Sequence, residues 1–541
     1  MLRRCLGLAI AGVFFLGLTP VWGQGVATYD KDAVKALSKK IDNHLAKVWK
    51  KAKVAPAARA EDHVFFRRLN LDLVGRIPDL INIQDFLDDD RPEKRWEWVD
   101  RFLDGDEHPR HFANVWRQVM LGQQTNQQAQ FLMPQFEAWL RDRITQNVTL
   151  DKLVQQILTN NPGNPNMGFQ PNQPVSPQLF FVANENKAEN LAGATSRVFL
   201  GVKIECAQCH AHPFAKWKQD QFWEFAAFFS GQQQVNRPGG LGRQPNVAQV
   251  GGREILIPGT DKVVKAKFLT GKAPDWNKES GNARKILADW VTAKNNPYFA
   301  KAMADHIWAY LMGVSLLEPI MEPSDDNLMT HPELLDDLAK GLMDNNFDAK
   351  FLIRAIVHSD AYQRASGGTK LADKEDYQLF VRMPIRALSP EQIWDSVYMA
   401  TNGGKKQDEF KYNPQQFFNP NQMQTPRAQF LSKFANQDRR HEPQTSILQA
   451  LFMMNGKYMA EKTKVENNHD LKALAREGIN GGHAGRITSL YRLVLSRPPR
   501  QGELDRLIPY LERGGATGNL GEALSDVYWS LLNSSEFLHN H

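Results

Sequence analysis

Apolar side chains recur at helical spacing along most of the chain. Between residues 30 and 49 they follow steps of three and four residues, the pattern of an amphipathic helix with one buried face. The residues on this face are Val34, Leu37, Ile41 and Leu45. Similar patterns predict further helices at 64–73, 85–88, 92–103, 112–121, 131–144, 150–158, 190–200, 220–229, 283–293, 298–312, 332–345, 349–359, 390–400, 446–454, 484–495, 503–513 and 523–533. The chain is therefore predicted to be mainly α and multi-helical.

The helical pattern is interrupted between residues 237 and 271, a stretch rich in Gly and Val. Two short pieces within it, 254–257 and 263–268, have the composition and length of β-strands and are separated by a few turn-forming residues. This arrangement predicts a small β-hairpin. Because helices are predicted on both sides, the hairpin is expected to be an insert between two helical domains.

These patterns predict a two-domain protein. A second non-helical segment, 403–445, is heavy in Asn, Gln and Pro and is interpreted as a polar surface excursion or connector. The predicted parts are a signal peptide at 1–23, a helical domain at 24–231, a β-rich insert at 232–281 and a second helical domain at 282–541.

The first residues have the layout of a secretory signal peptide. A short basic stretch at 1–4 precedes an apolar run at 6–18, and small side chains at Val21 and Gly23 offer a cleavage site. The run is too short to span a bilayer comfortably, although an uncleaved anchor is the alternative. No later run is long enough for a membrane span. We therefore expect an exported protein, periplasmic or extracellular, without a transmembrane segment after signal removal.

Charge and cysteine content exclude some classes of partner and of stabilising bond. The chain has 66 Lys and Arg against 60 Asp and Glu, interspersed along the sequence. Without a concentrated basic stripe, no nucleic-acid partner is expected. There are three cysteines, and Cys5 would leave with the signal peptide. The mature chain would retain only Cys206 and Cys209, so its stability must come from packing and not from a disulfide framework.

The remaining cysteines form the motif Cys206-Ala207-Gln208-Cys209-His210. Cys-x-x-Cys-His is the attachment pattern of c-type haem. Two thiols three residues apart can reach both vinyl groups of one porphyrin, and His210 would then be an axial ligand of the iron. His212 is too close in sequence to reach the opposite face, so it would contact the haem edge or hydrogen-bond nearby. Met167 is a candidate distal ligand.

Three alternatives to haem remain open for this motif. Cys206 and Cys209 could form a redox-active or structural disulfide. Cys206, Cys209, His210 and His212 could instead bind zinc or another metal, although one short segment seldom surrounds an ion completely. The motif could also be an inert relic that holds no cofactor.

Other chemistry-bearing residues have simpler interpretations. Phe222, Phe225 and Phe229 share one helix face, which is interpreted as a buried face or, alternatively, as a wall for a porphyrin. His108 and His111 are interpreted as surface residues at a helix start. His331 precedes Pro332 and is expected to cap the following helix. No hydrolase motif, P-loop or dinucleotide-binding fingerprint is found.

Several segments resemble known families. In the N-terminal half, RRLNLDLVGRIP, FLGV, CAQCHAHPF and AAFF are similar to the planctomycete cytochrome C-like domain of unknown function. In the C-terminal half, IWA, HPELL, LIR, QAL, SRPP and LLNSSEF are similar to its usual partner domain, also of unknown function. The resemblance covers roughly 58–231 and 282–541. It implies export and a cytochrome-like segment, and it does not establish an activity.

The sequence departs from these families at two places. Ala211 stands between the two histidines of the motif, where the family usually has Asp or Asn. In the second half, Asp305-His306 replaces the family's Asn-Arg, and Gly313-Val314-Ser315 replaces its Gly-Arg-Gly. If this second patch is functional in relatives, its role here is in doubt.

Two functions from different classes follow. The first is an exported haem c protein in electron transfer or redox catalysis, with Cys206 and Cys209 as anchors and His210 as ligand. The second is a structural or interaction protein of the cell envelope, in which the same cluster holds a metal or forms a disulfide. The partner would be a redox or cell-envelope protein. A carbohydrate-active or hydrolytic role is a third, weaker hypothesis, because no nucleophile or paired-carboxylate motif supports it.

Overall fold

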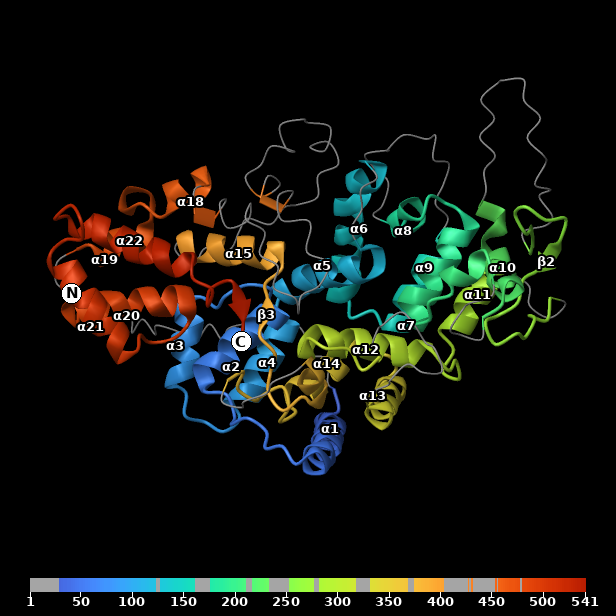
Figure 1. Ribbon diagram of the computed structural model, residues 1–541, viewed down its shortest axis with the longest axis horizontal. Coiled ribbons are helices and arrows are strands. Elements are labelled where there is room, and N and C mark those ends of the chain that lie inside the picture. The colour runs from blue at the N-terminus through green and yellow to red at the C-terminus, as the bar shows by residue number, and fades with distance from the viewer. Residues whose placement is uncertain are drawn as a thin grey trace, which may run out of the picture.

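The computed structural model describes most of the chain and shows a mainly α protein, as predicted (Figure 1). The described residues are 29–122, 127–160, 176–210, 217–232, 253–276, 282–317, 331–367, 374–402, 427, 430–431, 453–454, 456–476 and 479–541. The predicted signal peptide and most of the polar segment 403–445 lie outside them. Within the described part, no helix combines the length and the apolar character needed to cross a membrane.

Helices account for most of the described elements. Their bounds are α1 Lys31–Ala52, α2 Asp62–Leu73, α3 Leu80–Asp88, α4 Lys94–Asp104, α5 Glu107–Leu121, α6 Gln127–Thr145, α7 Leu150–Thr159, α8 Leu179–Ala183, α9 Ala188–Leu200, α10 Gln219–Ala226, α11 Ala283–Val291, α12 Phe299–Met312, α13 Pro332–Asp344, α14 Ala349–Val357, α15 Pro390–Thr401, α18 Lys457–Lys462, α19 His469–Leu474, α20 Gly482–Leu495, α21 Gln501–Glu512 and α22 Leu520–Leu532. Short 3-10 helices are η1 Glu205–Gln208, η2 Ala227–Gln232, η3 Lys374–Leu379 and η6 Val465–Asn467.

The first helix illustrates how the sequence pattern produces the fold. The Asp30 side chain accepts hydrogen bonds from the backbone amides of Asp32 and Ala33, which caps the start of α1. At the other end Lys53 adopts a left-handed conformation, and its amide bonds back to the last turn. The four apolar residues that define the predicted face are all buried. Their burial places α1 against α13 and α14.

The predicted β-hairpin is present. Strands β1 (Glu254–Leu256) and β2 (Val263–Lys265) pair antiparallel, with Ile255 opposite Val264. Both of these side chains are buried, and they pack into the same hydrophobic core as α10. A second small sheet pairs β3 (Arg386–Ala387) with β4 (His539–Asn540), which brings the end of the chain into the middle of the molecule (Figure 1).

Two hydrophobic cores lie along the length of the molecule. The larger core contains buried side chains from Val34 to Met383, on both sides of the hairpin, with α7 packed on α11 and α9 on α12. The smaller core is built from residues between Leu388 and Phe537, together with Leu71 and Ile77 from the N-terminal half. The helical regions before and after the hairpin therefore share buried contacts; their division into two domains stays a prediction.

The two ends of the molecule carry different parts of the chain (Figure 1). Helices α9, α10 and α11 and the β1–β2 hairpin gather at one end, whereas α20, α21 and α22 form the opposite end. Helices α2, α4, α5, α12 and α14 lie between them. The Cys-x-x-Cys-His motif belongs to the end that carries the hairpin, since its 3-10 helix η1 contacts α10.

Candidate functional site

The cysteine motif lies on a tight turn between α9 and α10. Cys206, Ala207 and Gln208 belong to the 3-10 helix η1, and Cys209 and His210 follow it directly. The side chain of Ala207 is fully buried, whereas Cys206, Cys209 and His210 are exposed. Ala207 therefore fixes the inner side of the turn to the core, and both thiols are displayed on its outer side.

Hydrogen bonds from α10 hold the end of this turn. The Trp223 indole Nε1 donates to the carbonyl of Gln208 at 3.0 Å. The Gln219 amide Nε2 donates to the carbonyls of Gln208 and Cys209 at 3.3 and 3.1 Å. Side-chain donors thus satisfy carbonyls that no regular helix would pair, so contacts within the protein fix the backbone at the end of the turn.

The beginning of the turn is tied to α9. Arg197 Nη1 lies 3.2 Å from Glu205 Oε1, and both side chains are about one-third exposed, so this ion pair contributes modestly. Gly193 faces the same carboxylate side chain, and a Cβ at this position would lie 2.8 Å from Glu205 Cγ. The close approach of η1 to α9 consequently depends on a glycine one helical turn before Arg197.

The two thiols are not joined to each other. Cys206 and Cys209 are both free cysteines, so the disulfide alternative is not realised in this structure. Across the part of the chain that the structure describes, no group of three or more His, Cys, Asp and Glu side chains is arranged to hold a metal ion. His212 and Met167 lie outside the described residues. The four-ligand zinc site and the distal methionine therefore stay predictions.

The donor set fits covalent haem attachment. Two free, exposed thiols on one turn could supply the thioether donors, and the exposed imidazole of His210 follows them at once. The aromatic face of α10 has a different role, because Phe222, Phe225 and the following Phe229 are at most 1% exposed and belong to the larger core. The buried-face interpretation is confirmed, and these rings do not line an open surface.

Two of the three histidines that were interpreted from sequence alone have other environments than predicted. His108 and His111 are buried, 1% and 6% exposed, so their assignment as surface residues was wrong. His108 Nδ1 bonds to the carbonyl of Leu73 at 3.0 Å, and burial lowers the pKa of His108 to about 3. His331 is the N-cap residue of α13, as predicted, but its side chain makes no capping hydrogen bond; its Nε2 instead donates to the carbonyl of Gln378 at 2.7 Å.

The patch in which this sequence departs from the family also forms defined contacts. Asp305 on α12 accepts hydrogen bonds from the Ser315 hydroxyl and the Leu316 amide, both at 2.7 Å. The neighbouring His306 donates from Nε2 to the carbonyl of Val198 at 2.8 Å, and burial lowers the pKa of its imidazole. Asp305 holds the chain after α12, and His306 ties α12 to α9. His306 therefore supports the helix that leads into the cysteine motif.

The segment that resembles the family near the start of the chain contains a buried carboxylate. Asp72 is 1% exposed and lies on α2 between Leu71 and Leu73. Its Oδ2 accepts from Arg386 Nη2 and from the Tyr362 hydroxyl, each at 2.8 Å, and its Oδ1 accepts from Asn540 Nδ2 at 2.9 Å. Burial and the Asp72 charge raise the pKa of Tyr362 well above its usual range.

Strand pairing assembles the donors around Asp72. Arg386 and Asn540 are opposite residues in the β3–β4 pair, so this small sheet delivers both of them to the same carboxylate. The Tyr310 hydroxyl donates to the Asp72 carbonyl at 2.9 Å and lies 2.5 Å from His111 Nε2. Sequence reasoning did not identify this cluster. The signal was a charged residue between two leucines, which indicates a buried and paired charge.

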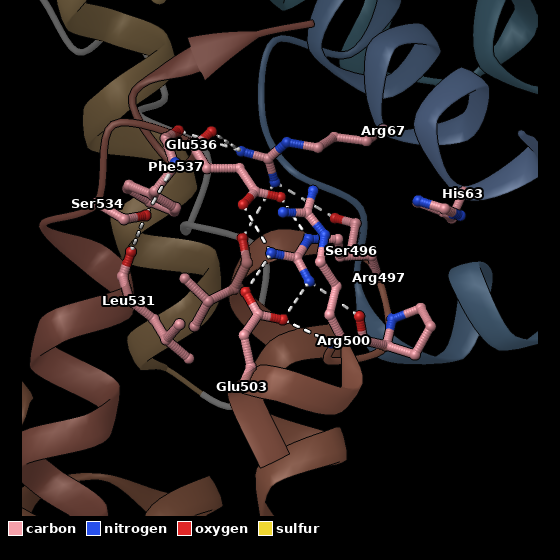
Figure 2. Close-up of polar contacts among 12 residues, drawn as sticks. His63, Arg67, Ser496, Arg497, Arg500, Glu503, Leu531, Ser534, Glu536 and Phe537 are labelled. Carbon is pink, nitrogen blue, oxygen red and sulfur yellow. Dashed lines mark hydrogen bonds and ion pairs between the residues drawn. The ribbon is translucent and has the colours of Figure 1, made fainter. Parts of the chain in front are cut away.

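The Ser-Arg-Pro-Pro segment forms a second cluster (Figure 2). Arg497 holds Glu503 with both terminal nitrogens, each at 2.8 Å, and holds Glu536 at 2.6 and 2.8 Å. Hydrogen bonds from Arg497 lower the pKa of Glu503 to about 2. Arg67 on α2 donates to the carbonyls of Val494 and Phe537 at 3.0 and 3.1 Å. This cluster therefore joins α2 to α20 and α21.

Comparisons with known proteins identify two families in tandem. Residues 40–234 match PSCyt2, described as a protein of unknown function (DUF1549), and residues 283–511 match PSD1, described as a protein of unknown function (DUF1553). No curated protein and no solved structure matches the chain significantly. The cysteine motif and Asp72 fall within the first match, and Arg386 and Arg497 within the second. The chain therefore belongs to the proteins that fuse a PSCyt2 domain to a PSD1 domain, as its resemblance implied.

Proposed function

We propose that this protein is an exported c-type haem protein, with Cys206 and Cys209 as the thioether anchors and His210 as an axial ligand of the iron. The observation that carries the proposal is the display of two free thiols and the adjacent imidazole on one turn. When bound, the haem would supply one-electron redox chemistry. The chain itself contributes the orientation of the attachment groups.

The contacts of the turn support this role. Covalent attachment needs both thiols at a fixed spacing, and η1 is held at its end by α10 and at its beginning by α9. The buried Ala207 prevents the turn from rotating inward. A thiol pair that served only as packing would be expected in the core, because unpaired cysteine is among the most buried residue types.

Export is part of the same proposal. The predicted signal peptide directs the chain out of the cytoplasm, and its removal leaves the two motif cysteines as the only thiols in the mature protein. Covalent tethering keeps a cofactor on a protein outside the cell, where a dissociated haem would be lost by dilution. The redox partner would be another protein of the periplasm or cell envelope.

A haem-stained denaturing gel with a pyridine haemochrome spectrum tests the proposal. The protein is expressed with its signal peptide in a bacterial host that carries c-type maturation machinery. We expect staining that is lost in the double variant Cys206→Ala/Cys209→Ala and retained in Gln208→Ala, which keeps both thiols and the backbone contacts of the turn. Folded, exported protein that does not stain would refute the proposal, and metal analysis of the same turn would then test the zinc alternative.

A further inference from the structure

A cavity of about 730 Å³ lies near the hairpin end of the molecule. It is bordered by α11, by the chain that follows β2 and by the turn that leads into α12. Its volume falls within the range of small-molecule sites in proteins, roughly 300–1,000 Å³. None of Cys206, Cys209 and His210 lines it, so the proposed haem site does not account for it.

A stack of three aromatic rings lies beside this cavity, and two of the rings line it. Phe228 stacks on Phe268 with ring centroids 5.3 Å apart, and Phe268 stacks on Trp290 at 4.8 Å, with interplanar angles of 14° and 11°. Phe228 and Phe268 are buried, and Trp290 is half-buried. Trp290 is the last ring of the stack, and both it and Phe268 line the cavity. The two rings beneath Trp290 hold its indole in a fixed orientation.

Polar side chains of both signs complete the lining. Lys272 and Lys285 supply two positive charges, and Asp275 and Asp289 supply two negative charges. Lys285 Nζ lies 2.6 Å from Asp289 Oδ2, so part of this charge is neutralised within the wall. Asn295 adds a side-chain amide that can both donate and accept hydrogen bonds. The lining therefore has many donors and acceptors and no net charge.

The aromatic rings and the balanced charges together determine which class of ligand the cavity can bind. A purely apolar molecule would remove the charged side chains from water without replacing their hydrogen bonds, which is costly. An anion or a cation would meet like charges as often as opposite ones. A neutral molecule with hydroxyl groups and one apolar face meets neither penalty, because its hydroxyls can both donate and accept. A sugar ring has this character: its hydroxyls lie around the rim and its C–H bonds form the flat face.

We propose that this cavity binds a neutral saccharide, with the C–H face of one sugar ring against the indole of Trp290. The hydroxyl groups would pair with the side chains of Asn295, Lys272 and Asp275. The site is at the same end of the molecule as the cysteine motif, but it is built from other residues. The inference therefore does not depend on haem attachment, and a protein without haem would still bind the sugar.

Saturation-transfer-difference NMR on the full-length mature protein tests this inference. The probes are cellotriose, xylotriose and mannotriose, each measured separately. We expect saturation of the ring protons of at least one probe and a weaker affinity, by about tenfold, in Trp290→Ala, since one aromatic contact contributes up to about 1.4 kcal/mol. Trp529→Ala is the matched control, because Trp529 is also half-buried but lies on α22 at the opposite end of the molecule.

A second variant keeps the test decisive if Trp290→Ala does not fold. Asn295 is exposed, so Asn295→Ala should fold normally and weaken binding through the loss of hydrogen bonds to hydroxyls. The proposal is overturned if the folded protein saturates none of the three probes. It is also overturned if Asn295→Ala and Trp290→Ala bind as well as the Trp529→Ala control, or if a sulfated oligosaccharide binds more tightly than every neutral probe.

Discussion

Replacement of Asp72 by Asn should destabilise the whole molecule although it changes neither the volume nor the shape of the side chain. The substitution removes a negative charge that faces the buried guanidinium of Arg386. The side chains of this pair are 2% and 4% exposed, so water cannot replace the lost partner. Arg386 would then remain charged and buried beside a neutral amide.

The magnitude follows from the contacts of the carboxylate. Removal of one partner of a buried ion pair costs about 3–5 kcal/mol. The introduced amide would retain one oxygen acceptor for the Tyr362 hydroxyl or for Asn540, so one of these two donors would also lose its partner, at a cost of roughly 1–3 kcal/mol. These terms are not additive. We therefore expect a loss of about 4 kcal/mol, a large fraction of the 5–15 kcal/mol typical of folded proteins.

Urea unfolding, followed by both far-UV circular dichroism and tryptophan fluorescence, measures this loss. The control is Asp344→Asn, which breaks an exposed pair with Lys340 on one helix and should cost no more than about 0.5 kcal/mol. The double variant Asp72→Asn/Arg386→Met removes both charges and should be more stable than Asp72→Asn alone. A single Asp72→Asn variant within about 1 kcal/mol of the wild type would refute the reasoning.

Three further predictions concern other parts of the molecule. Gly75→Ala should lower the free energy of unfolding by about 3 kcal/mol, because φ is +84° and a Cβ would overlap the buried imidazole of His111. Gly259→Ala is the matched control: φ is +75° there too, but the space around it is open, so the free energy of unfolding should fall by only about 1–2 kcal/mol in the same urea assay. Since His108 has a pKa of about 3 when folded and about 6.5 when unfolded, the unfolded state binds its proton first as the pH falls. Stability should therefore decrease from pH 6.5 toward pH 3, and His108→Asn should reduce this slope by about 1.4 kcal/mol per pH unit. Trp223→Phe should accelerate hydrogen exchange in the cysteine turn more than in the rest of the larger core, measured by mass spectrometry; unchanged exchange in the turn would show that the indole does not hold it.

Local patterns were sufficient for the elements whose stability is local. The spacing of apolar residues predicted α1 with its buried face, and the short apolar pieces after residue 253 predicted the β1–β2 hairpin. In both cases the information lies within a few residues of the position concerned. The spacing of Cys206 and Cys209 is of the same kind, so the turn that displays them could be recognised before its geometry was known.

Local sequence patterns could not predict contacts between residues that lie far apart in the sequence. The burial of His108 and His111 depends on α2 and α12, which lie far away in the sequence. Asp72 is paired through a strand formed by the last residues of the chain, and no local pattern indicates that these residues return to the centre of the molecule. The cavity beside Trp290 lies between the segment after β2 and α11, and its aromatic stack forms only when these segments pack together.

The most direct test of the central proposal is the mass of the peptide that contains Cys206 and Cys209. The exported, mature protein is purified from a host that attaches haem to a coexpressed cytochrome c, digested under denaturing conditions and measured by mass spectrometry. The proposal predicts one peptide that carries a single haem joined to both cysteines, and no alkylation of either thiol. An unmodified peptide in which both thiols react with an alkylating reagent would contradict it.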